Sequence, residues 1–162
     1  MSKIMIIFVV MNIIFLDIDG VLRTESSDKQ WSLKLKLPIP EKRYRNFSTK
    51  SVSNINFINS LVRCKIVVTS NWKLYYSLTE LKEIFRKQGI LLEVIDRTGI
   101  STSRGEEILE WLSVNDGVKN WVVIDDQVKD LSLIDDSRIV KCDYQIGFDD
   151  DSLVDKVLDV LI

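Results

Sequence analysis

The sequence predicts a three-layer α/β domain in which a central, mainly parallel sheet of five strands lies between helices. Short apolar runs alternate along the chain with segments whose apolar residues recur at helical spacing. Such alternation is typical of parallel strands joined by right-handed helical crossovers. The 162 residues, 46% of them hydrophobic, suffice for one sizeable core, so we expect residues 1–162 to form a single domain.

The predicted strands are continuous apolar runs, the pattern of strands buried on both faces of a parallel sheet. They comprise residues 13–16, 65–69, 91–95, 121–124 and 138–142. The first lies in the apolar segment Ile4–Leu16, which resembles the core of a signal peptide. Because this segment has no small-residue cleavage site and is too short to span a bilayer, we expect an extended first strand and no membrane partner. Met1 and Met11 are both candidate starts.

Four helices are predicted between and after these strands. They are marked by apolar spacing at 52–61, a capping box at Ser77–Glu80, a second capping box at Ser103–Glu106, and apolar spacing at 153–161 behind the acidic residues 149–151. Residues 23–48 are too few for a second domain, so we expect a small flap or minimal cap there. Leu33–Leu37 alternates like the exposed arm of a hairpin. This segment is rich in Lys and Arg, so it is either a solvated loop or a flap that faces substrate.

The composition excludes several classes of site. The chain has no histidine, which excludes histidine triads, histidine-ligated zinc and histidine general bases. Cys64 and Cys142 flank predicted strands, and we expect both to be small buried residues of a reduced, cytoplasmic protein. The net charge of −2 argues against stable coating of nucleic acid. The sequence leaves the oligomeric state open.

Two carboxylates, Asp17 and Asp19, stand directly after the first predicted strand. Gly20 follows them and lets the backbone approach a ligand. Open α/β sheets place their sites at this carboxyl edge of the strands. Neighbouring carboxylates repel each other unless a cation or a proton compensates, which indicates a binding site. An Asp-x-Asp-Gly sequence alone also fits an ordinary turn, so the other strand ends decide between the two interpretations.

Polar groups follow the second and fourth predicted strands too. They are Thr69-Ser70-Asn71 and Asp125-Asp126, and Arg104 begins the helix before the fourth strand. Carboxylates are ligands that Mg²⁺ prefers, and an aspartate can attack phosphorus. The hydroxyl and backbone N–H at Thr69-Ser70 can bind phosphate oxygens, and Arg104 can offset their charge. Together these groups predict phosphoryl transfer with a phosphorylated substrate.

This pattern resembles the haloacid dehalogenase-like (HAD) superfamily over nearly the whole chain from Ile13. The resemblance implies a Rossmann-like, HAD-type fold with Mg²⁺ as cofactor, Asp17 as nucleophile and Asp19 as general acid and base. It implies that Asp17, the Asp19 backbone carbonyl, Asp125 and Asp126 hold the metal. Thr69 matches the family's hydroxyl motif. The family's usual lysine is Arg104 here, and Lys73 is a second candidate for the same fixed charge.

A closer resemblance is to the small HAD domains of bacterial "Swiss army knife" RNA-repair proteins. The segments that carry it are Phe15–Leu22, Thr69-Ser70-Asn71-Trp72-Lys73, Arg104–Ile108, Ile124–Asp126 and Gly147-Phe148. The resemblance implies a phosphatase that acts on nucleotides or nucleic-acid ends. The substrate-binding residues would then be Gly20, Ser70, Asn71, Trp72 and Lys73. For Trp72, packing in the core and stacking on a base are both open.

Two other functions remain open from the sequence. A receiver-like signalling domain would use Asp96, at the end of the third predicted strand, as phosphate acceptor. A catalytically weak HAD module would bind nucleic acid or a protein partner without turnover.

Overall fold

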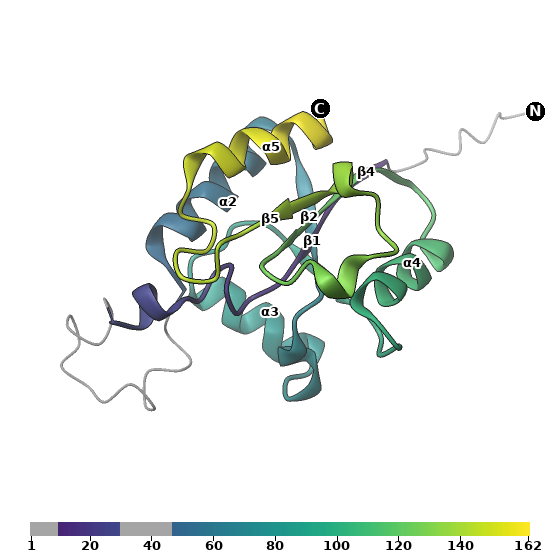
Figure 1. Ribbon diagram of the computed structural model, residues 1–162, viewed down its shortest axis with the longest axis horizontal. Coiled ribbons are helices and arrows are strands. Elements are labelled where there is room, and N and C mark those ends of the chain that lie inside the picture. The colour runs from purple at the N-terminus through teal and green to yellow at the C-terminus, as the bar shows by residue number, and fades with distance from the viewer. Residues whose placement is uncertain (1–9, 30–46) are drawn as a thin grey trace, which may run out of the picture.

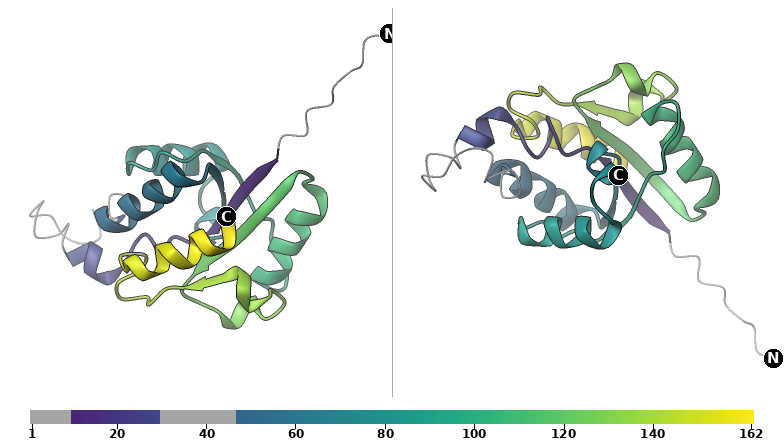
Figure 2. Two further views of the ribbon diagram at one scale, coloured as in Figure 1. Left: turned by 90° about the horizontal axis from the view of Figure 1, so that it is seen from above. Right: turned by 90° about the horizontal axis from the view of Figure 1, so that it is seen from below.

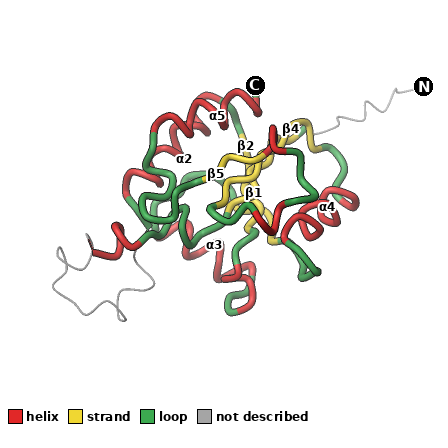
Figure 3. Tube along the Cα trace, in the orientation of Figure 1, coloured by secondary structure: helices red, strands yellow, loops and turns green. Residues whose placement is uncertain are grey.

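The computed structural model describes residues 10–29 and 47–162 (Figure 1). Five parallel strands form one sheet: β1 (Met11–Leu16), β2 (Cys64–Val68), β3 (Val94–Arg97), β4 (Val118–Asp125) and β5 (Ile139–Lys141). The helices α2 (Thr49–Leu61), α3 (Leu78–Lys87), α4 (Arg104–Val114) and α5 (Asp151–Leu161) connect or follow them, and residues 25–29 after β1 are also helical. The strands lie at the centre of the molecule with helices around them (Figure 3). The α/β fold with a parallel central sheet is confirmed.

Helices cover both faces of the sheet, which gives the three predicted layers (Figure 2). On one face, apolar residues of α2, α3 and α5 pack with the strand residues Ile14, Leu16, Ile66 and Val68. On the other face, Ile108 and Trp111 of α4 pack with the strand residues whose side chains point to that side, such as Phe15 and Val67. The strands are therefore buried on both faces, which is why their sequences are continuously apolar.

The strand order is β3-β2-β1-β4-β5. The chain thus builds outward from β1 in one direction, then returns to the other side of β1 with β4. Ligands bind at such a switch point in open α/β sheets, between the carboxyl ends of the two strands. Receiver domains have the order 2-1-3-4-5, in which the third strand is internal. Here β3 is an edge strand, and Asp96 accepts a hydrogen bond from Trp111 Nε1 at 2.7 Å, so the topology counts against the receiver-like alternative.

The third strand differs from its prediction. The apolar run 91–95 predicts a strand there, but β3 covers Val94–Arg97. Leu91 and Leu92 both lie in the loop before β3, where Leu91 is exposed and Leu92 is buried. The start of the apolar run therefore belongs to this loop and not to the strand. The parallel pairing with β2 begins only at Val94, opposite Ile66.

The two predicted capping boxes have different outcomes. Ser77 and Glu80 exchange both hydrogen bonds of the box at the start of α3. At α4, Ser103 Oγ accepts from the Glu106 N–H at 3.1 Å, but the Glu106 carboxylate instead accepts from the Thr102 backbone N–H. The second box is therefore only half formed.

Several sequence predictions fall on residues outside the described ranges. The apolar residues before Val10 and the hairpin arm Leu33–Leu37 lie there. The ends of the predicted flap are described, and an isolated antiparallel bridge joins Arg23 to Phe47. In the described part of the chain, no helix is long and apolar enough to cross a membrane.

The loop after β5 closes tightly on the loop after β1. Gly147 has φ +64°, and a Cβ on it would lie 2.3 Å from the Val21 carbonyl oxygen. The same oxygen accepts hydrogen bonds from the Phe148 N–H at 2.9 Å and from Ser51 Oγ at 3.1 Å. Gly147 is thus required both for its backbone conformation and for this close approach.

We expect Gly147→Ala to lower the free energy of unfolding by about 2–4 kcal/mol, because it adds left-handed strain to an overpacked contact. Gly99→Ala is the matched control, since nothing lies within 4 Å of a Cβ built there. Urea unfolding of both variants measures the difference. Equal stability of the two variants would contradict the close approach at Gly147.

Candidate active site

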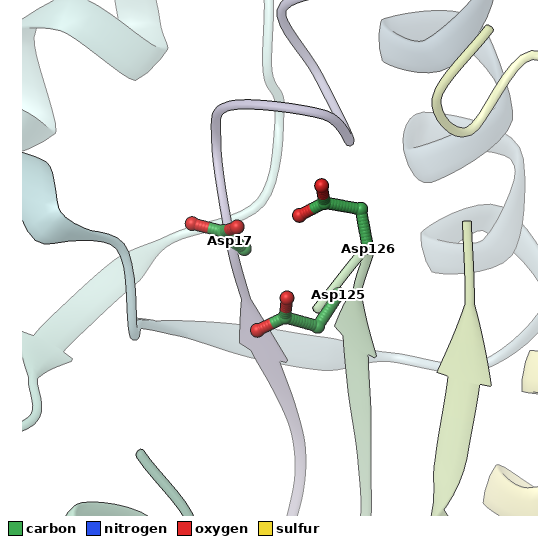
Figure 4. Close-up of side chains that lie close together, drawn as sticks. All are labelled: Asp17, Asp125 and Asp126. Atoms are coloured by element: carbon green, nitrogen blue, oxygen red, sulfur yellow. The ribbon is translucent and has the colours of Figure 1, made fainter. Parts of the chain in front are cut away.

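Three carboxylates gather at the switch point between β1 and β4. Asp17 follows the last residue of β1, Asp125 ends β4, and Asp126 comes next. Each offers an oxygen atom, and these atoms lie within 4.8 Å of one another (Figure 4). Leu16 pairs with Ile124, so the parallel register places Asp17 level with Asp125. The sheet itself therefore brings together two residues that are far apart in the sequence.

Gly20 shapes the third side of this cluster. Its φ is +80°, and a Cβ on it would lie 2.5 Å from Asp126 Cγ and 2.6 Å from Asp126 Oδ2. The Asp126 carboxylate thus packs directly against the backbone of the loop after β1. Any side chain at position 20 would displace that carboxylate from the cluster, so the glycine is needed where it was predicted to let the backbone approach a ligand.

The two carboxylates at the sheet edge are buried and electrostatically strained. Burial, and after it the neighbouring charge of Asp125, raise the pKa of Asp17 to about 7. Burial also raises the pKa of Asp125. Arg104 opposes both effects, since its Nη1 lies 3.2 Å from Asp17 Oδ2 and 2.5 Å from Asp125 Oδ2. Arg104 is thus the fixed cation of the carboxylate cluster, although it compensates only part of the charge.

The donor set fits a hard divalent cation. Its ligand atoms are carboxylate oxygens, which Mg²⁺ prefers, and two or three such groups suffice because Mg²⁺ keeps several waters. Three carboxylates beside one guanidinium also leave net negative charge for a cation to neutralise. The Asp19 side chain is not part of this group. Its predicted role as a ligand concerned the backbone carbonyl, and that role stays a prediction.

The Asp19 carboxylate is held by two other donors. Its Oδ2 accepts a hydrogen bond from Trp72 Nε1 at 2.8 Å, and its Oδ1 accepts one from Arg23 Nη1 at 3.1 Å. Nothing local in the sequence predicts the contact with Trp72, which is 53 residues away. Arg23 lies four residues after Asp19, and that spacing was the available indication of an ion pair.

The polar residues after β2 divide between the cavity and the interior. Ser70 and Asn71 line the cavity; Ser70 donates a side-chain hydrogen bond that lowers the pKa of Asp17, and Asn71 Oδ1 accepts from Arg104 Nη2 at 3.4 Å. Within the described ranges, the buried Thr69 hydroxyl has no hydrogen-bond partner, and Thr69 does not line the cavity. The structure thus gives Ser70 the hydroxyl that faces the site, and the catalytic role of Thr69 stays a prediction.

Lys73, the second candidate for the fixed charge, pairs with a residue outside the carboxylate cluster. Its Nζ forms a buried ion pair with Glu107 and donates to Thr98 Oγ1 at 3.0 Å and to the Gly99 carbonyl at 2.8 Å. Burial lowers the pKa of Lys73. Its ammonium therefore anchors α4 to the loop after β3, and Arg104 is the residue whose charge reaches the site.

A cavity of about 750 Å³ opens above the cluster, within the range of small-molecule sites. Its lining includes Asp17, Asp19, Gly20, Ser70, Asn71, Arg104 and Asp126, and further residues that the sequence analysis did not single out: Arg23, Thr24, Glu25, Asp28, Gln127, Asp130 and Tyr144. Thus most predicted site residues share one cavity. The added residues come from the segments after β1, β4 and β5, and most lie too far beyond the strand ends for the strand-end pattern to predict them.

Comparison with known proteins gives one match. A family model described as "HAD domain in Swiss Army Knife RNA repair proteins" matches residues 13–153. No curated protein and no solved structure matches the chain. The matched range contains the whole carboxylate cluster, the cavity-lining residues, β1 from Ile13 onward and the other four strands in full.

Rising pH should destabilise the metal-free protein through Asp17. Its pKa rises on folding from 3.8 to about 7, so between these values the unfolded chain releases a proton that the folded protein keeps. This contribution to stability is complete below about pH 3.8 and is lost as the pH rises to about 7. In EDTA we expect the free energy of unfolding of the wild type to fall by about 1 kcal/mol per pH unit through this group. Asp17→Asn should lack this fall. Urea unfolding between pH 4.5 and 7 measures it, with the exposed Asp159→Asn as the matched control. Parallel pH curves for Asp17→Asn and wild type would contradict this electrostatic strain.

Mg²⁺ should stabilise the folded protein, because it would neutralise the buried cluster. We expect Mg²⁺ at about 100 times its dissociation constant to add about 2.7 kcal/mol to the free energy of unfolding. Asp126→Asn should weaken the effect strongly, since it removes one ligand group. Thermal unfolding with and without Mg²⁺ tests this, and Asp159→Asn should respond as wild type does. An Asp126→Asn variant with an unchanged Mg²⁺ response would place the ion elsewhere.

Proposed function

The chain belongs to the family of HAD domains found in Swiss Army Knife RNA repair proteins, and on that premise we propose that it is a Mg²⁺-dependent phosphomonoesterase that works through an aspartyl-phosphate. The observation that carries the proposal is the position of Asp17. Its carboxylate is buried at the switch point, lines the cavity and lies 3.2 Å from the Arg104 guanidinium. A nucleophile in this place has a fixed cation beside it and open space in front of it.

In the first step, an oxygen of Asp17 attacks the phosphorus of the substrate. The bond from phosphorus to the leaving-group oxygen breaks, and that oxygen takes a proton from Asp19. Arg104 holds the Asp17 carboxylate and offsets negative charge on the phosphoryl oxygens. The Ser70 hydroxyl and the Asn71 amide line the same cavity and are the polar groups that would donate to those oxygens.

In the second step, water attacks the phosphorus of the aspartyl-phosphate. Asp19 takes a proton from this water, the bond between phosphorus and Asp17 breaks, and inorganic phosphate leaves. Asp17 regains its carboxylate and Asp19 regains its proton, so both groups are ready for the next turnover. One carboxyl group thus serves as acid and then as base, as the order of the two proton transfers requires.

Asp17, Asp125, Asp126 and the Asp19 backbone carbonyl would hold the metal ion. When bound, Mg²⁺ neutralises the carboxylate cluster and the charge of the transferring phosphoryl group. We propose nucleotides or phosphorylated nucleic-acid ends as substrates, a choice supported by the family description and by the size of the cavity. Two buried free cysteines, Cys64 and Cys142, support a reducing, cytoplasmic location.

Phosphate release from an aryl phosphate in Mg²⁺ tests the proposal. We expect Asp17→Asn to lower kcat by about 10³-fold or more, because it removes the nucleophile. Asp96→Asn is the matched control: this residue also follows the apolar part of a strand, but its carboxylate contacts Trp111 and lies on the edge strand. Mass spectrometry after an acid quench should find phosphate on the peptide that contains Asp17.

Full activity in Asp17→Asn would overturn the mechanism. Loss of activity in Asp96→Asn alone would instead support a receiver-like acceptor on β3. A screen across nucleotides, sugar phosphates, phosphopeptides and phosphorylated RNA or DNA ends, with Asp17→Asn in parallel, then identifies the substrate class.

A further inference from the structure

The indole N–H of Trp72 lies 2.8 Å from Asp19 Oδ2 and donates a hydrogen bond to it. We infer that Trp72 is a positioning residue, which holds the Asp19 carboxyl group in the orientation from which it exchanges protons with the substrate. The inference rests on the proposed function, since it concerns how the proton carrier of that reaction is placed. It assigns a task to a residue that the sequence left between core packing and base stacking.

Asp19 needs such support because of where it stands. It lies in the loop after β1, its side chain is 56% exposed, and it faces the cavity. A general acid must stay within hydrogen-bond reach of the leaving-group oxygen, and a free exposed carboxylate samples several rotamers. Here each carboxylate oxygen has its own donor: Trp72 on Oδ2, and Arg23 on Oδ1 at 3.1 Å.

Trp72 is a rigid donor. Trp72 lies in the short 3₁₀ helix η2 (Asn71–Leu74), which follows β2 and is capped by Ser70. Only 9% of Trp72 is exposed. Its ring packs with the rings of Tyr76 and Phe47, at centroid distances of 5.5 and 6.3 Å. This packing leaves little of the ring for a base to stack on. It fixes the direction in which the N–H points.

The second donor is fixed as well. Arg23 forms two hydrogen bonds with Asp28, from Nε to Oδ1 at 3.3 Å and from Nη2 to Oδ2 at 3.0 Å, and its remaining Nη1 reaches Asp19. Trp72 and Arg23 come from different segments of the chain, so Asp19 is held from two directions. Each carboxyl oxygen has two acceptor positions, and the bond from Trp72 therefore leaves room on Asp19 for the proton.

The positioning role of Trp72 can be tested by changing the leaving group of the substrate. In the first step the leaving-group oxygen takes the proton of Asp19, and an alkoxide needs that proton far more than a nitrophenolate does. The ratio kcat/KM includes only the steps up to departure of the leaving group, so the later attack of water does not affect it. Misplacement of Asp19 should therefore lower kcat/KM for alkyl phosphates and spare it for nitrophenyl phosphate. A purely structural defect would lower both equally.

The experiment compares glycerol 2-phosphate with p-nitrophenyl phosphate in wild type, Trp72→Phe and Asp19→Asn. Trp72→Phe keeps an aromatic ring and removes the N–H donor. We expect kcat/KM for the alkyl ester to fall by about tenfold, a fraction of the 10²–10⁴-fold that general acid catalysis supplies, and the aryl ester to stay within about twofold. Asp19→Asn should show the same selectivity for the leaving group with a larger loss on the alkyl ester.

Val157→Ala is the control for a purely structural defect, because it removes buried volume from α5 and leaves Trp72 and its ring contacts with Tyr76 and Phe47 in place. It should lower the unfolding temperature without changing the ratio between the two esters. If Trp72→Phe unfolds, the benzothiophene analogue of tryptophan, in which sulfur replaces the N–H, provides the same test with the ring shape kept. Equal losses on both esters, or none on the alkyl ester, would overturn the positioning role alone. Absence of Asp17-dependent release from both esters by wild type would overturn the proposed function as well.

Discussion

The Arg104 guanidinium contacts two buried carboxylates, Asp17 and Asp125, at the base of the cavity, and the charge balance of the site depends on that contact. The parallel register places Asp17 and Asp125 side by side at the sheet edge. Burial there disfavours their charged forms and raises both pKa values. One nitrogen of Arg104 contacts both carboxylates, while another reaches Asn71. A lysine would bring only a single ammonium to this place, so the planar guanidinium suits the geometry that the two strand ends impose.

Arg104 reaches this position because the start of α4 is fixed on several sides. The Ser103 side chain caps the helix, and the Arg104 backbone N–H donates to Asp130 at 3.0 Å. One turn further on, the buried pair of Glu107 and Lys73 joins the helix to the segment after β2. Lys73 therefore contributes to the site without facing it, because its ammonium pairs with Glu107 on the helix that carries Arg104. Removal of either partner would leave a buried charge unpaired, which is costly.

Strand-end rules predict the cluster well, because β1, β2 and β4 are internal strands whose apolar runs stop at the sheet edge. The same rule misplaces β3, an edge strand of only four residues, Val94–Arg97, in which half the side chains are charged. Apolar spacing also cannot reveal partners. Lys73 and Glu107 are 34 residues apart, and no local pattern marks them as a pair. For this reason the sequence analysis includes Lys73 among the candidate phosphate-binding residues. Tertiary pairing decides which of two nearby cations serves the site.

The loop that carries Asp19 is shaped by contacts from distant parts of the chain. Gly20 packs against Asp126, and the Val21 carbonyl accepts hydrogen bonds from α2 and from the turn at Gly147-Phe148. The loop cannot open without breaking contacts with three other segments, so its conformation is tied to the fold as a whole. Such a site is preorganised by long-range packing rather than by its own short sequence. The same glycines that permit these approaches make the site and the stability of the domain inseparable, because any side chain at either glycine would disturb both.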